Sequence, residues 1–116
     1  MVIDMKHMMR LNEEPFKLIK DGSKIIELRL NDEKRQMISS GDLITFENRS
    51  NGDTIQTEVV ELHKYPSFEE LYKHFDKVSM GYKEDEVADP KDMEEYYGSE
   101  EQSKYGVVGI ELKLRK

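Results

Sequence analysis

Hydrophobic and polar residues alternate in the segment 24–30, which reads Lys-Ile-Ile-Glu-Leu-Arg-Leu. The alternation has a period of two, and this period predicts a β-strand over the whole segment. One predicted face is aliphatic and belongs to the core: Ile26, Leu28 and Leu30. The other face carries Glu27 and Arg29, so the strand has a charged side.

Three further segments have the composition of strands. Residues 43–46 form one, a second runs from about residue 54 to 62, and the last spans 105–114. Asn51-Gly52 lies between the first two and is a strong signal for a hairpin. The last strand places Val108, Ile110, Leu112 and Leu114 on one face.

Helices are predicted by caps and by apolar spacing. Asn12 can cap a short helix that Gly22 ends. Ser67 begins a capping box, and apolar residues then recur at helical spacing until Gly81: Phe68, Leu71, Tyr72, Phe75 and Val78. Asp89-Pro90 can begin a short helix that runs through Tyr97. The polar segment 31–40 fits either a short helix or a long turn.

The order of these elements predicts the fold class. Few strand-helix-strand units could form parallel crossovers, and no repeat or low-complexity segment is present. We therefore predict an α+β domain that spans residues 1–116, with a mostly antiparallel, curved or closed sheet and helices packed at its ends.

Composition narrows the setting and the partners. The chain has no cysteine, which excludes disulfides and thiol nucleophiles, and no apolar run long enough to span a bilayer. We expect a cytoplasmic protein with no membrane contact. The formal net charge is -7, whereas proteins that coat nucleic acids are usually basic. Any role in nucleic-acid binding must therefore use a local basic patch or a pocket.

The negative charge is concentrated in the segment 84–101. Lys91 is the single basic residue of this segment, and nine residues are acidic: Glu84, Asp85, Glu86, Asp89, Asp92, Glu94, Glu95, Glu100 and Glu101. A solvated loop with a short helix explains this run. A sharper hypothesis is a negative lid that rejects long nucleic acids and admits a small nucleoside. A third is an acidic face that docks a basic partner protein. The spacing does not match a calcium-binding EF-hand loop.

Lys24, Glu27 and Arg29 form the main candidate site. Glu27 and Arg29 share a strand face and lie roughly 7 Å apart along it. A face with both signs of charge can bind a ligand that offers hydrogen-bond donors and anionic oxygens, such as a base with a phosphate. The alternative is an exposed Glu-Arg pair that only solvates the sheet.

The chain resembles the ASCH (activating signal cointegrator homology) domain family. The resemblance rests on these residues: Pro15-Phe16, Ile19, Gly22, Lys24, Glu27, Arg29, Leu30, Lys34-Arg35, Gly41-Asp42, Ile44 to Phe46, and Tyr105 to Ile110. It implies a PUA-like fold, a small β-barrel with helices at its openings. It also implies an RNA-related role, with a ligand cleft near Lys24, Glu27 and Arg29.

One branch of this family is enzymatic and hydrolyses the amide of N4-acetylcytidine. Lys24 matches the Lys of that branch, but Glu27 stands where the branch has a Thr, and Glu84 lies near its distant Glu. A carboxylate is not a substitute for a hydroxyl nucleophile. Glu27 could instead act as a general base while Lys24 or Arg29 stabilises negative charge. The same trio could serve a ribonuclease. We rank these hydrolase hypotheses below binding of RNA or a nucleoside.

Four more residues are candidates for ligand binding. The resemblance also covers His7, which could hold the N-terminal segment against the pocket or reach a ligand. Lys34 and Arg35 could form an outer positive rim that contacts phosphate. Tyr105 is predicted to begin a strand at the mouth of the cleft, where it could stack on a base.

No metal or cofactor is predicted. The three histidines are widely separated, so a metal site would need residues that converge only in the fold: His7, His63 and His74. The methionine-rich N-terminus could pack on the domain or form a homodimer: Met1, Met5, Met8 and Met9.

Overall fold

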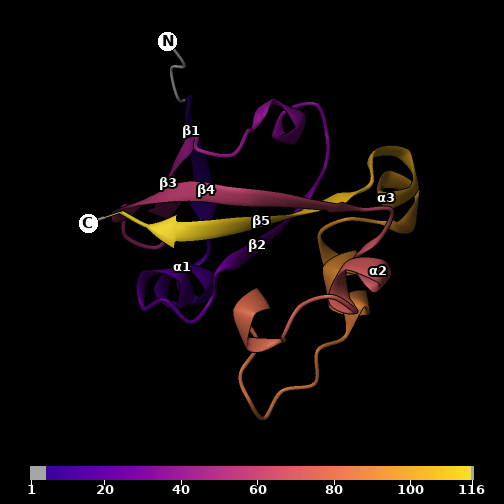
Figure 1. The fold of residues 1–116 in the computed structure, drawn as a ribbon. Helices are drawn as coiled ribbons and strands as arrows, with labels where there is room; N and C mark the ends of the chain where they lie inside the picture. The colour runs from indigo at the N-terminus through magenta and orange to yellow at the C-terminus, as the bar shows by residue number, and fades with distance from the viewer. Residues whose placement is uncertain (1–4, 116) are drawn as a thin grey trace.

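The computed structural model describes residues 5–115, and Figure 1 shows their arrangement. Five strands are present: β1 (Lys6–Leu11), β2 (Ile26–Leu30), β3 (Leu43–Asn48), β4 (Thr54–Tyr65) and β5 (Val107–Leu114). Three α-helices accompany them: α1 (Glu13–Lys20), α2 (Phe68–Tyr72) and α3 (Ser99–Tyr105). Three 3-10 helices complete the fold: η1 (Arg35–Met37), η2 (Val78–Met80) and η3 (Pro90–Glu95).

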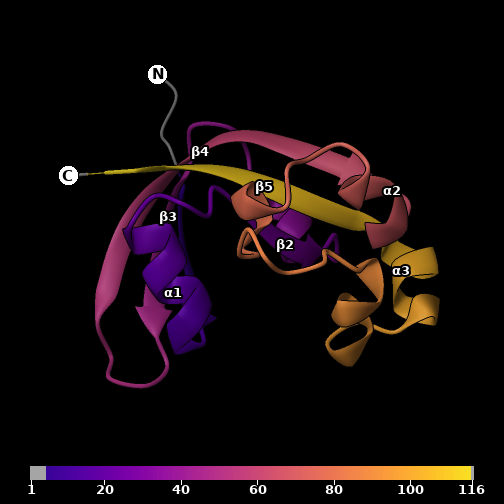
Figure 2. The same cartoon turned by 90° about the horizontal axis from the view of Figure 1, so that it is seen from below.

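The strands form one sheet in the order β1-β3-β4-β5-β2. Only β1 and β3 pair in parallel, and the other three pairs are antiparallel. The sheet curls into an arch with α1 beneath it (Figure 2). Its two edge strands come close to each other at one point, where Arg29 of β2 donates a hydrogen bond to the carbonyl of Arg10 in β1 at 3.2 Å. The predicted α+β class is confirmed, as a curled half-barrel open between β1 and β2.

The two faces of β5 contribute to two different hydrophobic clusters. The larger cluster joins β1, β3, β4 and β5 to α1: Met9, Leu11, Phe16, Ile19, Ile38, Ile44, Phe46, Val59, Val108, Ile110 and Leu112. The smaller cluster joins β2 and the start of β5 to α2 and η2: Ile26, Leu28, Phe68, Leu71, Met80 and Val107. Alternation along β5 therefore buries side chains on both sides of the sheet.

Gly109 allows α2 to pack closely on β5. A Cβ atom at this position would lie 3.1 Å from Cγ2 of Ile26 and 3.4 Å from Cδ1 of Leu71. Only glycine fits that space without displacing a neighbour. The backbone of β5 thus supports helix α2, whose Tyr72 lines the cavity described below.

Several predicted boundaries were wrong. β2 begins at Ile26, so Lys24 precedes the strand. The helix expected up to Val78 stops at Tyr72, and the separate helix η2 follows it, where the Asp76 carboxylate accepts the Val78 N–H at 3.1 Å. Ser67 caps α2 as predicted, since its hydroxyl accepts the Glu70 N–H.

The closing strand also begins later than expected. Tyr105 is the last residue of α3, and Gly106 turns the chain with a φ of 72° before β5 starts. Strand β1 was not predicted, and it pairs in parallel with a strand far along the chain. The helix expected through Tyr97 is the 3-10 helix η3, which ends at Glu95. No helix within residues 5–115 is both long and apolar enough to cross a membrane.

Candidate functional site

Lys24, Glu27 and Arg29 form one buried ion-pair cluster. The Lys24 Nζ donates to one Glu27 carboxylate oxygen at 2.8 Å, and the Arg29 Nε donates to the other at 2.8 Å. The side chains are 9%, 4% and 13% exposed, respectively. The hypothesis that Glu27 and Arg29 are only an exposed, solvated pair is therefore wrong.

Local backbone structure positions these side chains. The Lys24 N–H donates to the Leu18 carbonyl at the end of α1, and this bond fixes the approach to β2. The aliphatic part of Lys24 lies against Gly81, where an added Cβ would be 3.0 Å from the Lys24 Cδ. Gly81 has a φ of 107°, which side chains with a Cβ rarely adopt. Its lack of a side chain lets Lys24 reach Glu27.

The cluster keeps its charges. Burial alone would raise the pKa of Glu27, but the attraction and hydrogen bonds of Lys24 and Arg29 outweigh burial and hold that pKa below its usual range. Burial opposes the charge of Arg29 as well, yet Glu27 and then Tyr97 raise its pKa overall. One carboxylate thus neutralises only one of two cations. The cluster carries one net positive charge, which favours an anionic or strongly hydrogen-bond-accepting ligand.

A cavity of about 450 Å³ opens beside the cluster. Leu11 of β1 and Leu28 of β2 both line it, so it lies at the open side of the half-barrel. Beyond the cluster, its basic side chains are Arg10 and Arg49. Its acidic side chains come mainly from the segment after α2: Glu14, Glu86, Asp92 and Glu95.

Tyrosines form much of the remaining wall: Tyr72, Tyr82, Tyr96 and Tyr97. The hydroxyls of Tyr72 and Tyr82 are 2.9 Å apart, and Tyr82 donates to the Asp92 carboxylate at 2.8 Å. Burial raises the pKa of both Tyr72 and Tyr82, and at Tyr82 the hydrogen bonds to Tyr72 and Asp92 raise it further. Both hydroxyls therefore remain protonated as donors at neutral pH.

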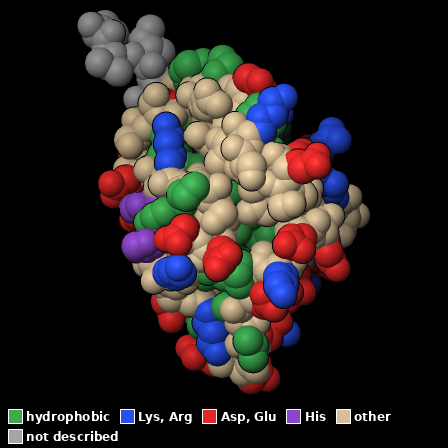
Figure 3. Space-filling model, turned by 90° about the vertical axis from the view of Figure 1, so that its right-hand side faces the viewer, with side chains coloured by type: hydrophobic (Ala, Val, Ile, Leu, Met, Phe, Trp, Pro, Cys, Tyr) green, Lys and Arg blue, Asp and Glu red, His purple; other side chains and the backbone are tan. Residues whose placement is uncertain are grey.

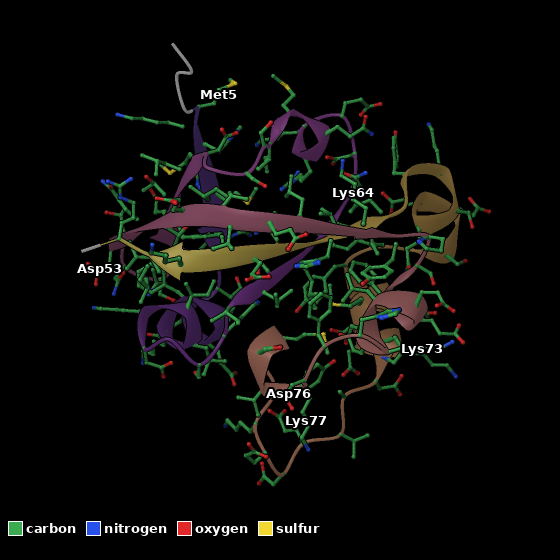
Figure 4. The ribbon with its side chains drawn as sticks, in the orientation of Figure 1. Met5, Asp53, Lys64, Lys73, Asp76 and Lys77 are labelled. Atoms are coloured by element: carbon green, nitrogen blue, oxygen red, sulfur yellow. The ribbon has the colours of Figure 1, made fainter. Side chains whose placement is uncertain are left out.

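Three acidic residues form one edge of the cavity, here called the acidic lip: Glu86, Asp92 and Glu95. Lys77 holds the loop that carries the first of them. Its Nζ donates to the carbonyls of Glu84 and Glu86 at 2.6 and 2.7 Å. Figure 4 labels Lys77 at the start of this loop, below the sheet. One lysine thus fixes the backbone of a segment whose carboxylates would otherwise repel one another. Figure 3 shows acidic and basic side chains interspersed over the side of the molecule that lies at the right in Figure 1.

His7 lies outside the cavity lining. Its Nε2 is 2.8 Å from the buried Asp42 carboxylate, which also accepts the N–H groups of Met5 and Ser39. Burial would raise the pKa of Asp42, but the hydrogen bond from His7 and those two N–H groups lower it. This contact holds β1 against the segment that leads into β3.

The other predicted residues also lie away from the cavity lining. Arg35 pairs with Asp32 at 3.4 Å, and the neighbouring Lys34 is exposed. Tyr105 is in α3, where the Lys104 Nζ lies 5.0 Å from its ring centre. Glu84 is exposed and meets Lys77 only through its carbonyl.

The described N-terminal methionines differ in burial. Met9 is buried in the larger core, whereas Met5 and Met8 are exposed. Met1 lies outside the described residues. A homodimer through this segment stays a prediction.

The sequence patterns missed the tyrosine wall. Tyr72 had the helical spacing of a core residue, and Tyr82 and Tyr97 follow at no regular interval. A usable signal was the density of tyrosines around the acidic segment, since tyrosine combines an apolar ring with a polar end. Arg10 and Arg49 were missed because their convergence depends on the parallel pairing of β1 with β3.

A five-stranded curled half-barrel with flanking helices and a cleft at its open side is a PUA-like architecture, which is proposed for RNA binding. The sequence model of the ASCH domain matches residues 9–115. The chain belongs to the ASCH domain family.

Solved structures agree with this assignment. The crystal structure of hypothetical protein PH0355 is 36% identical, with a TM-score of 0.77, and the match covers 96% of this chain and 100% of that one. The solution structure of protein PF0455 from Pyrococcus furiosus is 34% identical, with a TM-score of 0.70 and coverage of 97% and 99%.

A more distant structure supports the fold alone. ASCH from Zymomonas mobilis is 16% identical, with a TM-score of 0.69, and the match covers 95% of this chain and 68% of that one. The comparison with curated proteins finds no significant match.

Proposed function

We propose that this protein binds a nucleoside or a single nucleotide, either free or as part of a short RNA, in the cleft at the open side of its half-barrel. The observation that carries the proposal is the buried Lys24-Glu27-Arg29 cluster, which has one excess positive charge and borders a cavity of about 450 Å³. Cavities of this size typically hold small molecules and cofactors.

The charge of the cluster supports an anionic or carbonyl-rich ligand. Glu27 already accepts from both cations, so the remaining donor capacity belongs to the Lys24 ammonium and the Arg29 guanidinium. A phosphate or base carbonyl oxygen is a natural partner for these donors. Arg10 and Arg49 add positive charge to the same cavity.

The tyrosine wall supports a planar ligand. Unpaired bases are commonly recognised by stacking on aromatic rings and by hydrogen bonds to their edges. Tyr96 is 62% exposed and can offer such a ring, whereas the Tyr97 ring already packs on Phe68 with centroids 6.0 Å apart. Tyr82 adds a hydroxyl, and Asp92 and Glu86 can accept from the amino groups of a base.

The acidic lip supports a short ligand. Glu86, Asp92 and Glu95 repel the extended backbone of a long polyanion, and the net charge of -7 acts in the same direction. A single nucleotide can enter with its phosphate on the basic side, whereas a duplex cannot avoid the acids. The acidic lip would then act as the negative lid hypothesised for the segment 84–101.

Hydrolysis receives less support than binding. A general base works best with a pKa near the working pH, but Glu27 has a lowered pKa and both of its oxygens are bound. The hydrolase branch uses a Thr hydroxyl that Glu27 replaces here, and the neighbouring Ser23 does not supply one in the cavity, since its hydroxyl donates to Asp21 outside it. Turnover is therefore an outcome for the assay to detect.

The test is a thermal-shift screen with nucleosides, nucleoside monophosphates and RNA oligomers of increasing length. A ligand that binds only the native state raises the melting temperature, and the rise grows with ligand concentration. We expect a shift with nucleosides or mononucleotides that is lost in Lys24→Met and kept in Lys64→Met, which makes the same change at an exposed lysine of β4.

Two outcomes would contradict the proposal. One is the absence of a shift with every compound, and the other is an equal shift in both variants. Any positive compound is then incubated with the protein and analysed by chromatography. An unchanged compound supports a binding protein, whereas a hydrolysed one would identify the hydrolase.

A further inference from the structure

Two carboxylates and one imidazole converge where β4 pairs with β5. The side chains of Glu61 and His63 project from β4, and that of Glu111 projects from β5. One oxygen of each carboxylate and one imidazole nitrogen lie within 4.8 Å of one another. The three residues are absent from the cavity lining, so this constellation is independent of the proposed function. Figure 1 shows β4 and β5 side by side where they meet.

A β-bulge creates this arrangement. Val59 pairs with Leu112, so regular pairing would set Val60 opposite Glu111. The bulge between Val59 and Glu61 instead sets Glu61 opposite Glu111. Without it, Glu61 would face the hydrophobic interior beside Ile110. Bulges often redirect a side chain toward a functional position.

A cation would relieve the repulsion between the resulting pair of carboxylates. Like charges directly opposite each other on neighbouring strands destabilise a sheet. Within residues 5–115, no lysine or arginine forms an ion pair with Glu61 or Glu111, and His63 is their shared partner. Gly109 stands opposite His63, so β5 places no side chain directly across from the imidazole, and the space over Gly109 is filled by Ile26 and Leu71.

The distances suit a divalent metal ion. The His63 Nε2 lies 2.9 Å from Oε1 of Glu111 and 3.9 Å from Oε2 of Glu61. Nitrogen and oxygen ligands at zinc's usual bond lengths are about 3.4 Å apart in tetrahedral geometry. The two observed separations bracket that value, so small side-chain rotations would form a site. Phe75 packs edge-on against the His63 ring at 4.9 Å and limits its rotation.

We propose that Glu61, His63 and Glu111 bind a zinc-class divalent cation that links β4 to β5. One imidazole with two carboxylates favours zinc or a similar first-row ion over magnesium, which prefers oxygen ligands and its own water shell. Solvent can supply the fourth ligand, because Glu61 is exposed. The site is structural, since it closes across two strands and lies apart from the cleft.

The experiment is a calorimetric and thermal titration of the metal-free protein with ZnCl₂, with MgCl₂ as the comparison ion. We expect one zinc per chain, a rise in melting temperature that grows with zinc concentration, and no rise with magnesium. The rise should be lost in His63→Gln and in Glu111→Gln. It should persist in His74→Gln, which removes an exposed histidine outside the cluster.

Three results would overturn the proposal. They are the absence of zinc binding to the wild type, an equal response in His63→Gln and wild type, and loss of the response in His74→Gln alone. If either site variant is less stable without metal, the difference between its metal-free and zinc-containing melting temperatures still measures binding.

Discussion

Two cations share one buried carboxylate at Glu27. Each oxygen of that carboxylate accepts one hydrogen bond, from Lys24 or from Arg29. Burial makes such a group costly when it loses its partners, so the three residues act as a unit. The ionic contacts hold the two cations in position at the edge of the cavity.

Replacing Glu27 tests this unit. Glu27→Gln leaves two buried cations without a counter-charge, and we expect it to lower the free energy of unfolding by about 3–5 kcal/mol. Urea denaturation measures the loss. Glu14→Gln, which neutralises an exposed cavity-lining acid, should stay within about 0.5 kcal/mol of wild type. A loss below about 1 kcal/mol for Glu27→Gln would contradict the buried cluster.

Gly81 tests how Lys24 is positioned. Gly81→Ala and Gly52→Ala both force a Cβ into a left-handed backbone, with φ values of 107° and 80°. This strain should cost each variant about 1–2 kcal/mol. Only at Gly81 does the new Cβ meet another side chain, that of Lys24. Gly81→Ala should therefore be the less stable variant by about another 1 kcal/mol. Urea denaturation compares the two, and equal losses would contradict the contact.

At the scale of elements, the packing of α2 on β5 depends on Gly109. Gly109→Ala should overpack this contact and cost about 1–3 kcal/mol. Amide hydrogen exchange in α2 should become faster as the helix is pushed away. Gly98→Ala is the control, because that glycine has no atom within 4 Å of the added Cβ. Exchange in α2 that is equally fast in both variants would disprove the packing role.

Local patterns predicted some of these elements well and others poorly. The alternation around Glu27 and Arg29 gave the strand β2 and the central residues of the candidate site. It could not show that Glu27 is buried, because β2 is an edge strand whose charged face turns into the open side of the half-barrel. Burial there depends on the curl of the whole sheet.

The sequence patterns did not predict contacts between distant segments. Pairing of β1 with β3 joins residues more than 35 positions apart, and no local pattern encodes it. The helix expected through Val78 ends at Tyr72, and beyond it the Asp76 side chain competes for the Val78 N–H that a continued helix would use. The apolar alternation of the last strand extends back past Gly106 and predicts a strand at Tyr105, whereas the positive φ of Gly106 separates α3 from β5.

At the scale of the whole molecule, two buried carboxylates govern the response to acid. The pKa values of Glu27 and Asp42 are lowered in the folded state. The unfolded chain therefore takes up protons first as the pH falls. Their contribution is fully present above the usual carboxylate pKa and is lost as the pH drops through the lowered values.

The resulting prediction concerns stability between about pH 5 and pH 2. The free energy of unfolding, from urea titrations at successive pH values, should fall across this range. In Glu27→Gln the slope should be shallower, because one of the two carboxylates no longer titrates. A slope in that variant equal to the wild-type slope would contradict the lowered pKa of Glu27.

The most direct test of the central claim is an NMR titration of the labelled protein with the mononucleotide or nucleoside that stabilises it best. We predict that amide shifts concentrate at the cleft, at Lys24, Glu27, Arg29, Tyr82 and Tyr97. The resonances of η1, beside Lys34 and Arg35, should stay in place. Shifts centred on η1 or on the surface of α3, with the cleft unchanged, would contradict the assignment of the ligand site to the open side of the half-barrel.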